Sequence, residues 1–356
     1  MKAIVAAGAL ALCAAGAAQA QGTFPDQGER APVRPLFASD DMLEITLATE
    51  FKLINRQKER ENEERPALLV VHRGEAADSF EVDVRARGNF RKRTCSFPPL
   101  RLDFQTSAVE GTIFEGQDKV KLVGHCETRR ADYEQYVLHE YLIYKVFNLF
   151  DELSLKARLV KFNYVDTGDN DQTVTKYGFL LEPIADVAAR NGWDVVEAPV
   201  IPPDAVEPNM GVLVDVFMYF VGNTDYDPFF AEPDEEFCCH NIQPIGRSYG
   251  PVFPVPFDFD FSGVIDTRYA TPDPSLEIRS VRERLYRGVC RPIELLQPVF
   301  ARFNTLRPDI EALYQNQGGL DARGLRDTMR YIEDFYKTIN DPRLAEREFV
   351  RTCRRS

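Results

Sequence analysis

The chain of 356 residues is 44% hydrophobic and 28% charged, an ordinary composition for a globular protein of one large domain or two packed lobes. Its formal net charge of −13 disfavours non-specific binding to nucleic acid or to an anionic membrane, because such binding depends on positive charge. We therefore expect no nucleic-acid partner.

The N-terminus has the pattern of a secretory signal peptide, predicted to span residues 1–20. Lys2 supplies a positive start, residues 3–17 form a nearly unbroken apolar run, and Ala-Gln-Ala at 18–20 is a small-residue cleavage site. A membrane anchor is the alternative, but a spanning helix needs about 20 apolar residues. No later stretch approaches that length, so we expect an exported protein, periplasmic or extracellular, without a stable membrane span.

Residues 21–40 are rich in Pro, Gly and Gln and are predicted to form a loose leader. The following segment, residues 41–183, has mainly the periodicity of strands. Strands are predicted at 42–52, 67–72, 79–87, 100–104, 119–123, 157–166 and 177–183. One long helix over 131–150 is apolar around much of its circumference, as for a helix packed on a sheet.

Helical patterns dominate the remainder, residues 184–356. A Pro-rich loop within 185–208 precedes a predicted apolar helix at 210–221, a hairpin around 246–250, and helices at 292–303 and 320–337. Strands followed by helices predict an α+β fold of two lobes. The N-lobe, 41–183, is expected to be sheet-rich with one long helix, and the C-lobe, 184–356, mostly helical.

Removal of the signal peptide leaves an even number of cysteines, which in an exported chain favours two or three disulfides. They are Cys95, Cys126, Cys238, Cys239, Cys290 and Cys353. The adjacent pair, Cys238 and Cys239, is expected to bond to different, distant partners. A zinc site at Cys238-Cys239-His240 is the alternative, but its ligands lack the usual spacing of two to four residues.

Acidic and amide side chains gather between residues 222 and 263, and the candidates are Asp225, Asn241, Asp258 and Asp260. Carboxylates flanked by aromatic residues at a strand end are costly unless they are paired or bind a cation. Asp258 and Asp260 alternate along a strand and therefore share one face. Oxygen ligands of this kind suit Mg²⁺, which binds one or two carboxylates together with substrate phosphates.

Phosphoryl transfer needs a carboxylate that orients the attacking hydroxyl, an amide and a carboxylate on the metal, and a lysine on the phosphates. Asp225, Asn241 and Asp258 supply the first three in the order of a kinase catalytic segment. Asp227 is a rival to Asp225 as the catalytic carboxylate.

These motifs resemble those of the protein-kinase-like superfamily. They are G-N-x-D at 222–225, Asn241, P-x-D-x-D at 256–260, and R-x-R-G-N at 85–89 followed by basic residues. The last is similar to the CotH-type, spore-coat kinase-like branch, and the first three to the HipA-type and lipid-kinase branches as well. The similarity covers most of residues 80–265. It implies a two-lobed protein-kinase-like fold that binds Mg²⁺ and ATP or another nucleotide.

The resemblance also implies which residues bind the nucleotide: Arg87, Asn89, Lys121, Glu140 and Glu182. Arg87 and Asn89 would cover the phosphates, and Lys121 would contact them, with Lys119 as the alternative. Glu140, or else Glu134, would form the ion pair with that lysine. Asn241, Asp258 and Asp260 would bind the metal.

The leading hypothesis is an exported, CotH-like atypical kinase that transfers phosphate from a magnesium–nucleotide complex to a protein or cell-surface acceptor. A catalytically inactive relative that serves as a binding or envelope-assembly protein is the first alternative. A metal-dependent hydrolase using the same acidic cluster is the second.

Overall fold

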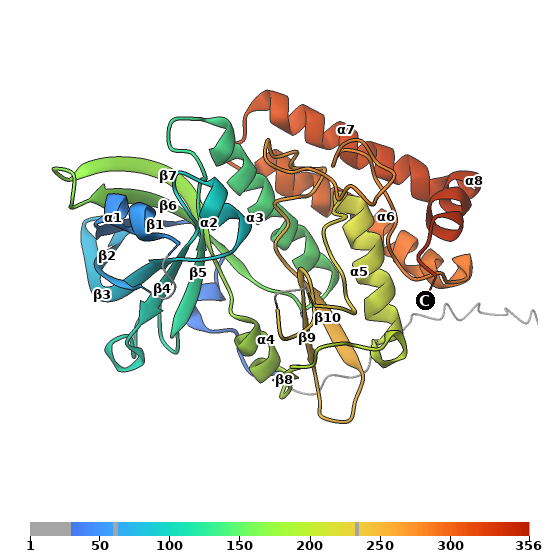
Figure 1. Cartoon of the computed structure of the whole chain (residues 1–356), viewed down its shortest axis with the longest axis horizontal. Coiled ribbons are helices and arrows are strands. Elements are labelled where there is room, and N and C mark those ends of the chain that lie inside the picture. The colour runs from blue at the N-terminus through green and yellow to red at the C-terminus, as the bar shows by residue number, and fades with distance from the viewer. Residues whose placement is uncertain (1–29, 60–62, 232–234, 356) are drawn as a thin grey trace, which may run out of the picture.

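The computed structural model describes residues 30–59, 63–231 and 235–355 (Figure 1). The predicted signal peptide lies outside these residues, as do residues 21–29 of the predicted leader. Within the rest of that leader, Pro35–Phe37 form a short 3-10 helix in which Leu36 and Phe37 are buried. None of the described helices combines the length and the hydropathy that a membrane span requires.

Strands make up most of the N-terminal half (Figure 1). In chain order its elements are β1 Leu43–Thr49, α1 Phe51–Gln57, β2 Arg65–Arg73, β3 Ala76–Ala86, α2 Phe90–Thr94, β4 Leu100–Phe104, β5 Lys119–Val123, α3 Asp132–Phe150, β6 Ala157–Asp166 and β7 Gln172–Leu181. The C-terminal half contains α4 Ile184–Arg190, β8 Asp194–Val195, α5 Pro208–Val221, β9 Ile242–Gly246, β10 Val252–Pro256, α6 Ile293–Asn316, α7 Ala322–Asn340 and α8 Pro342–Ala345.

The strands β1 to β7 form a closed barrel in the order β1-β2-β3-β4-β5-β7-β6. Its neighbouring strands are antiparallel except β1 and β6, which are parallel and close it. Every second residue of β1 from Ile45 onward points inward, and inward-facing residues such as Leu69 and Val84 are fully buried beside them. The barrel therefore encloses a hydrophobic core of its own.

The predicted two-lobed, protein-kinase-like fold with a sheet-rich N-lobe is wrong. The seven strands close into a mixed barrel, and the helices lie mostly C-terminal to it. The periodicity of residues 42–52 and 157–166 predicts a strand in each segment but not that the two pair. That pairing depends on long-range packing, because a strand's side-chain pattern sets its buried face rather than its neighbour.

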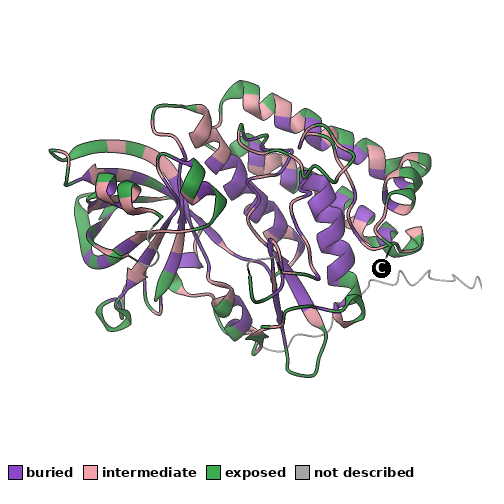
Figure 2. Cartoon of the chain, in the orientation of Figure 1, coloured by how far each residue is buried: buried purple, intermediate pink, exposed green. Residues whose placement is uncertain are grey.

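A second hydrophobic core lies between the barrel and the C-terminal helices. Helix α3 packs against β7 on one side and α6 on the other, so buried residues line much of its length (Figure 2). Helix α5 is buried from Met210 to Val221, and α6 and α7 pack beside it. The hairpin β9–β10 forms a small three-stranded sheet with β8 and packs against α5 through β10.

The six cysteines of the described residues form three disulfides: Cys95–Cys126, Cys238–Cys239 and Cys290–Cys353. The expectation of disulfides is confirmed, and it is compatible with an exported protein because such bonds persist in oxidising compartments. The expectation that Cys238 and Cys239 bond to distant partners is wrong, since the other four cysteines are already bonded to each other.

Candidate functional site

A cleft of about 600 Å³ is lined by residues from the barrel and from the C-terminal half. This volume is typical of a small-molecule site. The barrel side contributes Arg87, Asn89, Arg91 and Lys121, and the opposite side contributes Asp225, His240, Asn241, Asp258 and Asp260. The structure thus brings together seven of the nine residues that the sequence singles out, and it adds Arg91 and His240.

The cationic side of the cleft begins where β3 ends. Arg87 donates its backbone N–H to the Pro99 oxygen at 2.9 Å, and Gly88 then turns the chain with a φ of 79°. A positive φ is easily adopted by glycine, so the turn leads directly into α2. Phe90 of α2 packs edge-on against Phe261, with ring centroids 5.2 Å apart, and so joins the turn to the C-terminal half.

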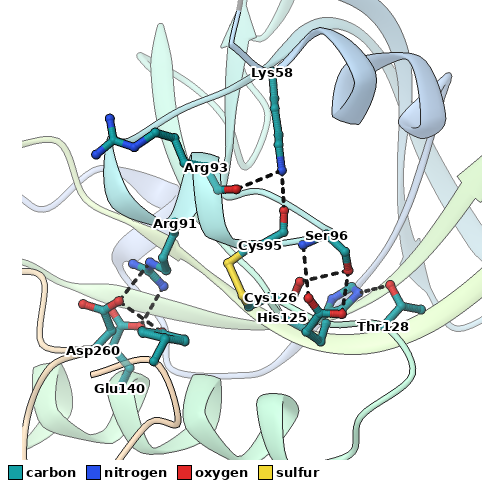
Figure 3. Close-up of a disulfide and its surroundings, with 12 residues drawn as sticks. Lys58, Arg91, Arg93, Cys95, Ser96, His125, Cys126, Thr128, Glu140 and Asp260 are labelled. Atoms are coloured by element: carbon teal, nitrogen blue, oxygen red, sulfur yellow. Dashed lines mark hydrogen bonds and ion pairs between the residues drawn. A yellow bond between two sulfur atoms is a disulfide. The ribbon is translucent and has the colours of Figure 1, made fainter. Parts of the chain in front are cut away.

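Arg91 is the centre of the ionic network beneath the cleft (Figure 3). Its Nη1 lies 3.3 Å from Oε2 of Glu140. Its Nη2 lies 3.1 Å from Oδ1 of Asp258, and its Nε lies 3.1 Å from Oδ2 of Asp260. The side chains of Arg91, Glu140 and Asp260 are each less than a tenth exposed, so this is a buried cluster of one cation and three carboxyl groups.

The resemblance implied an ion pair between Lys121 and Glu140. That expectation is wrong, because Glu140 pairs with Arg91 instead. Lys121 places its Nζ 4.8 Å from the centre of the Phe257 ring. Glu134, the alternative partner, pairs with Lys176 on β7. The sequence signal for Arg91 was the basic run 91–93, but that run does not reveal which of its side chains turns inward.

The surroundings of Asp258 and Asp260 shift the pKa values of these two carboxyl groups in opposite directions. Burial would raise the pKa of Asp258, but Arg91, Arg87 and Lys121 outweigh this effect and hold it below its usual value. Burial raises the pKa of Asp260 well above its usual value, and the neighbouring Asp258 and Glu140 add to the rise despite Arg91. Asp258 is therefore the ionised carboxylate best suited to bind a cation.

The pKa values of Glu140 and Lys121 are also shifted from their usual values. Burial raises the pKa of Glu140 to about 7, although Arg91 opposes the rise. Burial, assisted by Arg87, lowers the pKa of Lys121 to about 8. Asp260 is further held by the Tyr269 hydroxyl, which donates to its Oδ2 at 3.1 Å. The carboxylate of Asp260 is thus occupied by structural contacts, whereas the side chain of Asp258 is about a third exposed.

The end of α5 positions Asp225. Gly222 ends the helix with a φ of 70°, and the side-chain oxygen of Asn223 then accepts a hydrogen bond from the Asp225 N–H at 2.8 Å. The side chain of Asp225 remains about 40% exposed. The G-N-x-D motif is therefore both a helix cap and the turn that presents this carboxylate to the cleft.

The two residues that directly precede β9 hold Asp225. Nε2 of His240 lies 3.0 Å from its Oδ1. Asn241 donates from Nδ2 to the Asp225 backbone oxygen at 2.7 Å and to Oδ2 at 3.1 Å. His240 belongs to the same short segment as Asn241, but the sequence does not show that its side chain meets Asp225, which lies 15 residues earlier.

Both candidate metal ligands have left-handed backbone conformations, with φ of 52° at Asn241 and 56° at Asp258. Asn and Asp tolerate this region better than other non-glycine residues, and such conformations gather at functional sites. The two positions are tied together, because Phe257 donates its N–H to the Asn241 oxygen at 3.1 Å. The Tyr144 hydroxyl accepts from the Asp258 N–H at 2.9 Å.

The donor set fits Mg²⁺ completed by a phosphate ligand. Asn241 and Asp258 offer an amide oxygen and an ionised carboxylate, the hard ligands this ion prefers, and Mg²⁺ usually retains waters and substrate phosphates as well. Within residues 30–59, 63–231 and 235–355, three or more His, Cys, Asp or Glu side chains do not gather into a self-contained metal centre.

The structure does not bring Glu182 into the cleft. Its carboxylate accepts from the Lys156 N–H at 3.0 Å and pairs with Arg190 at 3.5 Å, so it connects β7 to α4. Asp227, the rival of Asp225, pairs with Arg354 at 2.8 Å and accepts from the Phe229 N–H. Lys119, the alternative to Lys121, is exposed beside Asp118.

The disulfide Cys95–Cys126 connects the two segments that bear the cations (Figure 3). Cys95 directly follows α2, which carries Arg91, and Cys126 follows β5, which carries Lys121. The Phe97 N–H donates to the Cys126 oxygen at 3.0 Å beside it. The covalent link therefore holds the cationic wall of the cleft together.

No model of a known protein family matches the chain. A search of curated proteins likewise finds no match. The resemblance of its motifs to the protein-kinase-like superfamily therefore stays a prediction from sequence.

Proposed function

We propose that the cleft binds a magnesium–nucleotide complex, with ATP as the expected nucleotide, and transfers its terminal phosphate to a hydroxyl group of a protein or cell-surface acceptor. One observation carries this proposal. Arg87 and Lys121 line the same cleft as a carboxylate and an amide, Asp258 and Asn241. Phosphoryl transfer requires cations that contact the phosphates. It also requires oxygen ligands that hold Mg²⁺.

Each residue has a role that follows from its environment. Arg87 and Lys121 bind phosphate oxygens, and Asn241 and Asp258 hold the cation, which neutralises charge on the phosphates when bound. Arg91 fixes the direction of Asp258 and Asp260 through its buried contacts. Asp225 orients the acceptor hydroxyl and takes its proton, while His240 and Asn241 hold that carboxylate in place.

Thermal unfolding of the mature protein tests this proposal. Mg²⁺ with ATP is expected to raise the unfolding temperature, and neither component alone is expected to give the full rise. Asp258→Asn is expected to lose most of the rise, because it removes the ionised metal ligand. Asp334→Asn is the matched control, since Asp334 is an exposed residue of α7 that pairs only at the surface with Lys337.

The other outcomes separate the alternatives. A rise in unfolding temperature without any formation of ADP would support the inactive binding protein. Hydrolysis of a phosphate ester in the absence of ATP would support the hydrolase. An equal rise in wild type and Asp258→Asn would remove Asp258 from the metal site.

The lowered pKa of Lys121 predicts a pH dependence of nucleotide affinity. Lys121 is charged below about pH 8 and loses its charge as the pH rises through that value, so affinity for Mg²⁺–ATP is expected to fall between pH 7 and pH 9. A charge-assisted hydrogen bond contributes about 1.5 to 3 kcal/mol, so the fall should be roughly tenfold or more. Lys121→Arg should flatten it, because arginine stays protonated. Titration calorimetry at each pH measures the effect, and an unchanged slope in Lys121→Arg would rule out Lys121 as its source.

A further inference from the structure

A second, smaller cavity of about 180 Å³ adjoins the cleft. The two share Asp225, His240 and Phe261. The carboxylate of Asp225 therefore stands between them, with the phosphate-binding cations on one side only. The cleft is the proposed site of the phosphate donor. The smaller cavity is the remaining space beside Asp225, the proposed catalytic carboxylate.

The walls of this cavity are rich in groups that form hydrogen bonds. Asp225, Thr271 and Asp273 supply oxygen atoms, and His240 and Arg287 supply nitrogens. Arg287 is fixed there, because its Nη1 donates to the backbone oxygens of Thr224 and Tyr226, the second at 3.0 Å. The Ser275 N–H donates to Asp273 at 2.7 Å and lowers the pKa of that carboxyl. The cavity thus offers both donors and acceptors of hydrogen bonds within a small volume.

The cavity also has aromatic lining residues. They include Phe261 and Phe230, and the Phe230 side chain is about half exposed. A ring-shaped polyol presents hydroxyl groups, which both donate and accept hydrogen bonds, around an apolar ring face. A lining that combines aromatic rings with polar groups suits such a molecule.

The volume sets the size of the occupant. The smaller cavity has less than a third of the volume of the cleft, about 180 Å³ against about 600 Å³, so we expect an occupant smaller than a nucleotide and close to a single sugar unit in size. An extended peptide would instead need a groove along several residues, since a bound strand advances about 3.3 Å per residue.

We infer that the smaller cavity binds the phosphate acceptor, and that the acceptor is a small polyhydroxylated molecule or a terminal unit of a glycan. This inference rests on the proposed function and specifies its acceptor. In the reaction, the acceptor oxygen forms a bond to the terminal phosphorus of the nucleoside triphosphate, and the bond from that phosphorus to the bridging oxygen breaks. The hydroxyl proton passes to Asp225, and the nucleoside diphosphate leaves with the bonding electron pair.

The test uses the mature protein with Mg²⁺–ATP and two sets of acceptors. One set contains glucose, mannose, N-acetylglucosamine, glycerol and myo-inositol, and the other is a mixture of peptides containing Ser, Thr and Tyr. The variant is Thr271→Phe, which fills the cavity from its exposed edge. Thr173→Phe is the matched control, because Thr173 is an exposed residue of β7 that lines neither cavity.

We expect the wild type to phosphorylate at least one of the sugars or polyols, and Thr271→Phe to lower kcat/KM for it at least tenfold. Thr173→Phe should match the wild type, and the rise in unfolding temperature with Mg²⁺–ATP should persist in Thr271→Phe. Phosphorylation of the peptides alone, or of neither set, would overturn this inference. If Mg²⁺–ATP does not stabilise the wild type at all, the proposed function itself fails, and this inference fails with it.

Discussion

Replacement of Asp225 by Asn is expected to lower the rate of phosphate transfer by about 10² to 10⁴, the usual contribution of a positioned general base. The amide is nearly the same size and keeps an oxygen for the hydrogen bond from Asn241, but it no longer accepts a proton. Affinity for Mg²⁺–ATP should change little, because Asn241 and Asp258 are the proposed metal ligands. Rates of ADP formation and titration calorimetry measure the two quantities separately.

Asp227→Asn is the control for this prediction. Asp227 was the rival catalytic carboxylate and lines the smaller cavity, but its oxygens are held by Arg354 and by the Phe229 N–H. Its replacement is therefore expected to cost some stability and to change the transfer rate by only a few fold. A large loss of transfer in Asp227→Asn, with a normal rate in Asp225→Asn, would exchange the roles assigned to these two residues.

Replacement of Arg91 by Met is expected to destabilise the protein by about 3 to 5 kcal/mol, because it leaves buried carboxyl groups without their cation. For a chain of this size that loss corresponds to a fall of roughly 10 °C in the unfolding temperature. Arg93→Met is the control, since Arg93 lies on the same helix, α2, but is exposed. Its effect on stability should stay within about 0.5 kcal/mol.

The effect of Arg91→Met should depend on pH. In the wild type the pKa of Asp258 is depressed, so its contribution to stability is present above pH 4 and is lost as the pH falls through its folded value. In the variant the pKa values of Glu140 and Asp260 should rise further, so the variant loses stability as the pH rises. The gap between wild type and variant should therefore be wider at pH 8 than at pH 5. A gap independent of pH would show that Arg91 acts through packing alone.

The local periodicity of the sequence predicted most strands and helices. Long-range contacts explain the segments in which the predicted bounds were wrong. The strand expected over 42–52 ends at Thr49, because Phe51 begins helix α1 with its side chain buried. Helix α6 was expected to end at Phe303 but continues to Asn316 through Pro298 and Pro308. Burial of Ile310 and Tyr314 in the second core outweighs the cost of these prolines.

The candidate site was predictable to the extent that its residues lie in short motifs. Asp225, Asn241 and Asp258 stand in the order that phosphoryl transfer requires, and the structure gathers them around one cleft. Arg91 and His240 could not be assigned from sequence, because their partners come from distant segments. Glu182 was placed by resemblance alone, and its carboxylate pairs with Arg190 elsewhere.

Titration of ATP into the mature protein, with Mg²⁺ and then with a chelator, tests the central claim most directly. The account predicts saturable binding at one site per chain that requires Mg²⁺, because the ion would be held jointly by Asn241, Asp258 and the phosphates. Binding of equal strength in the chelator, or no binding in either condition, would contradict it.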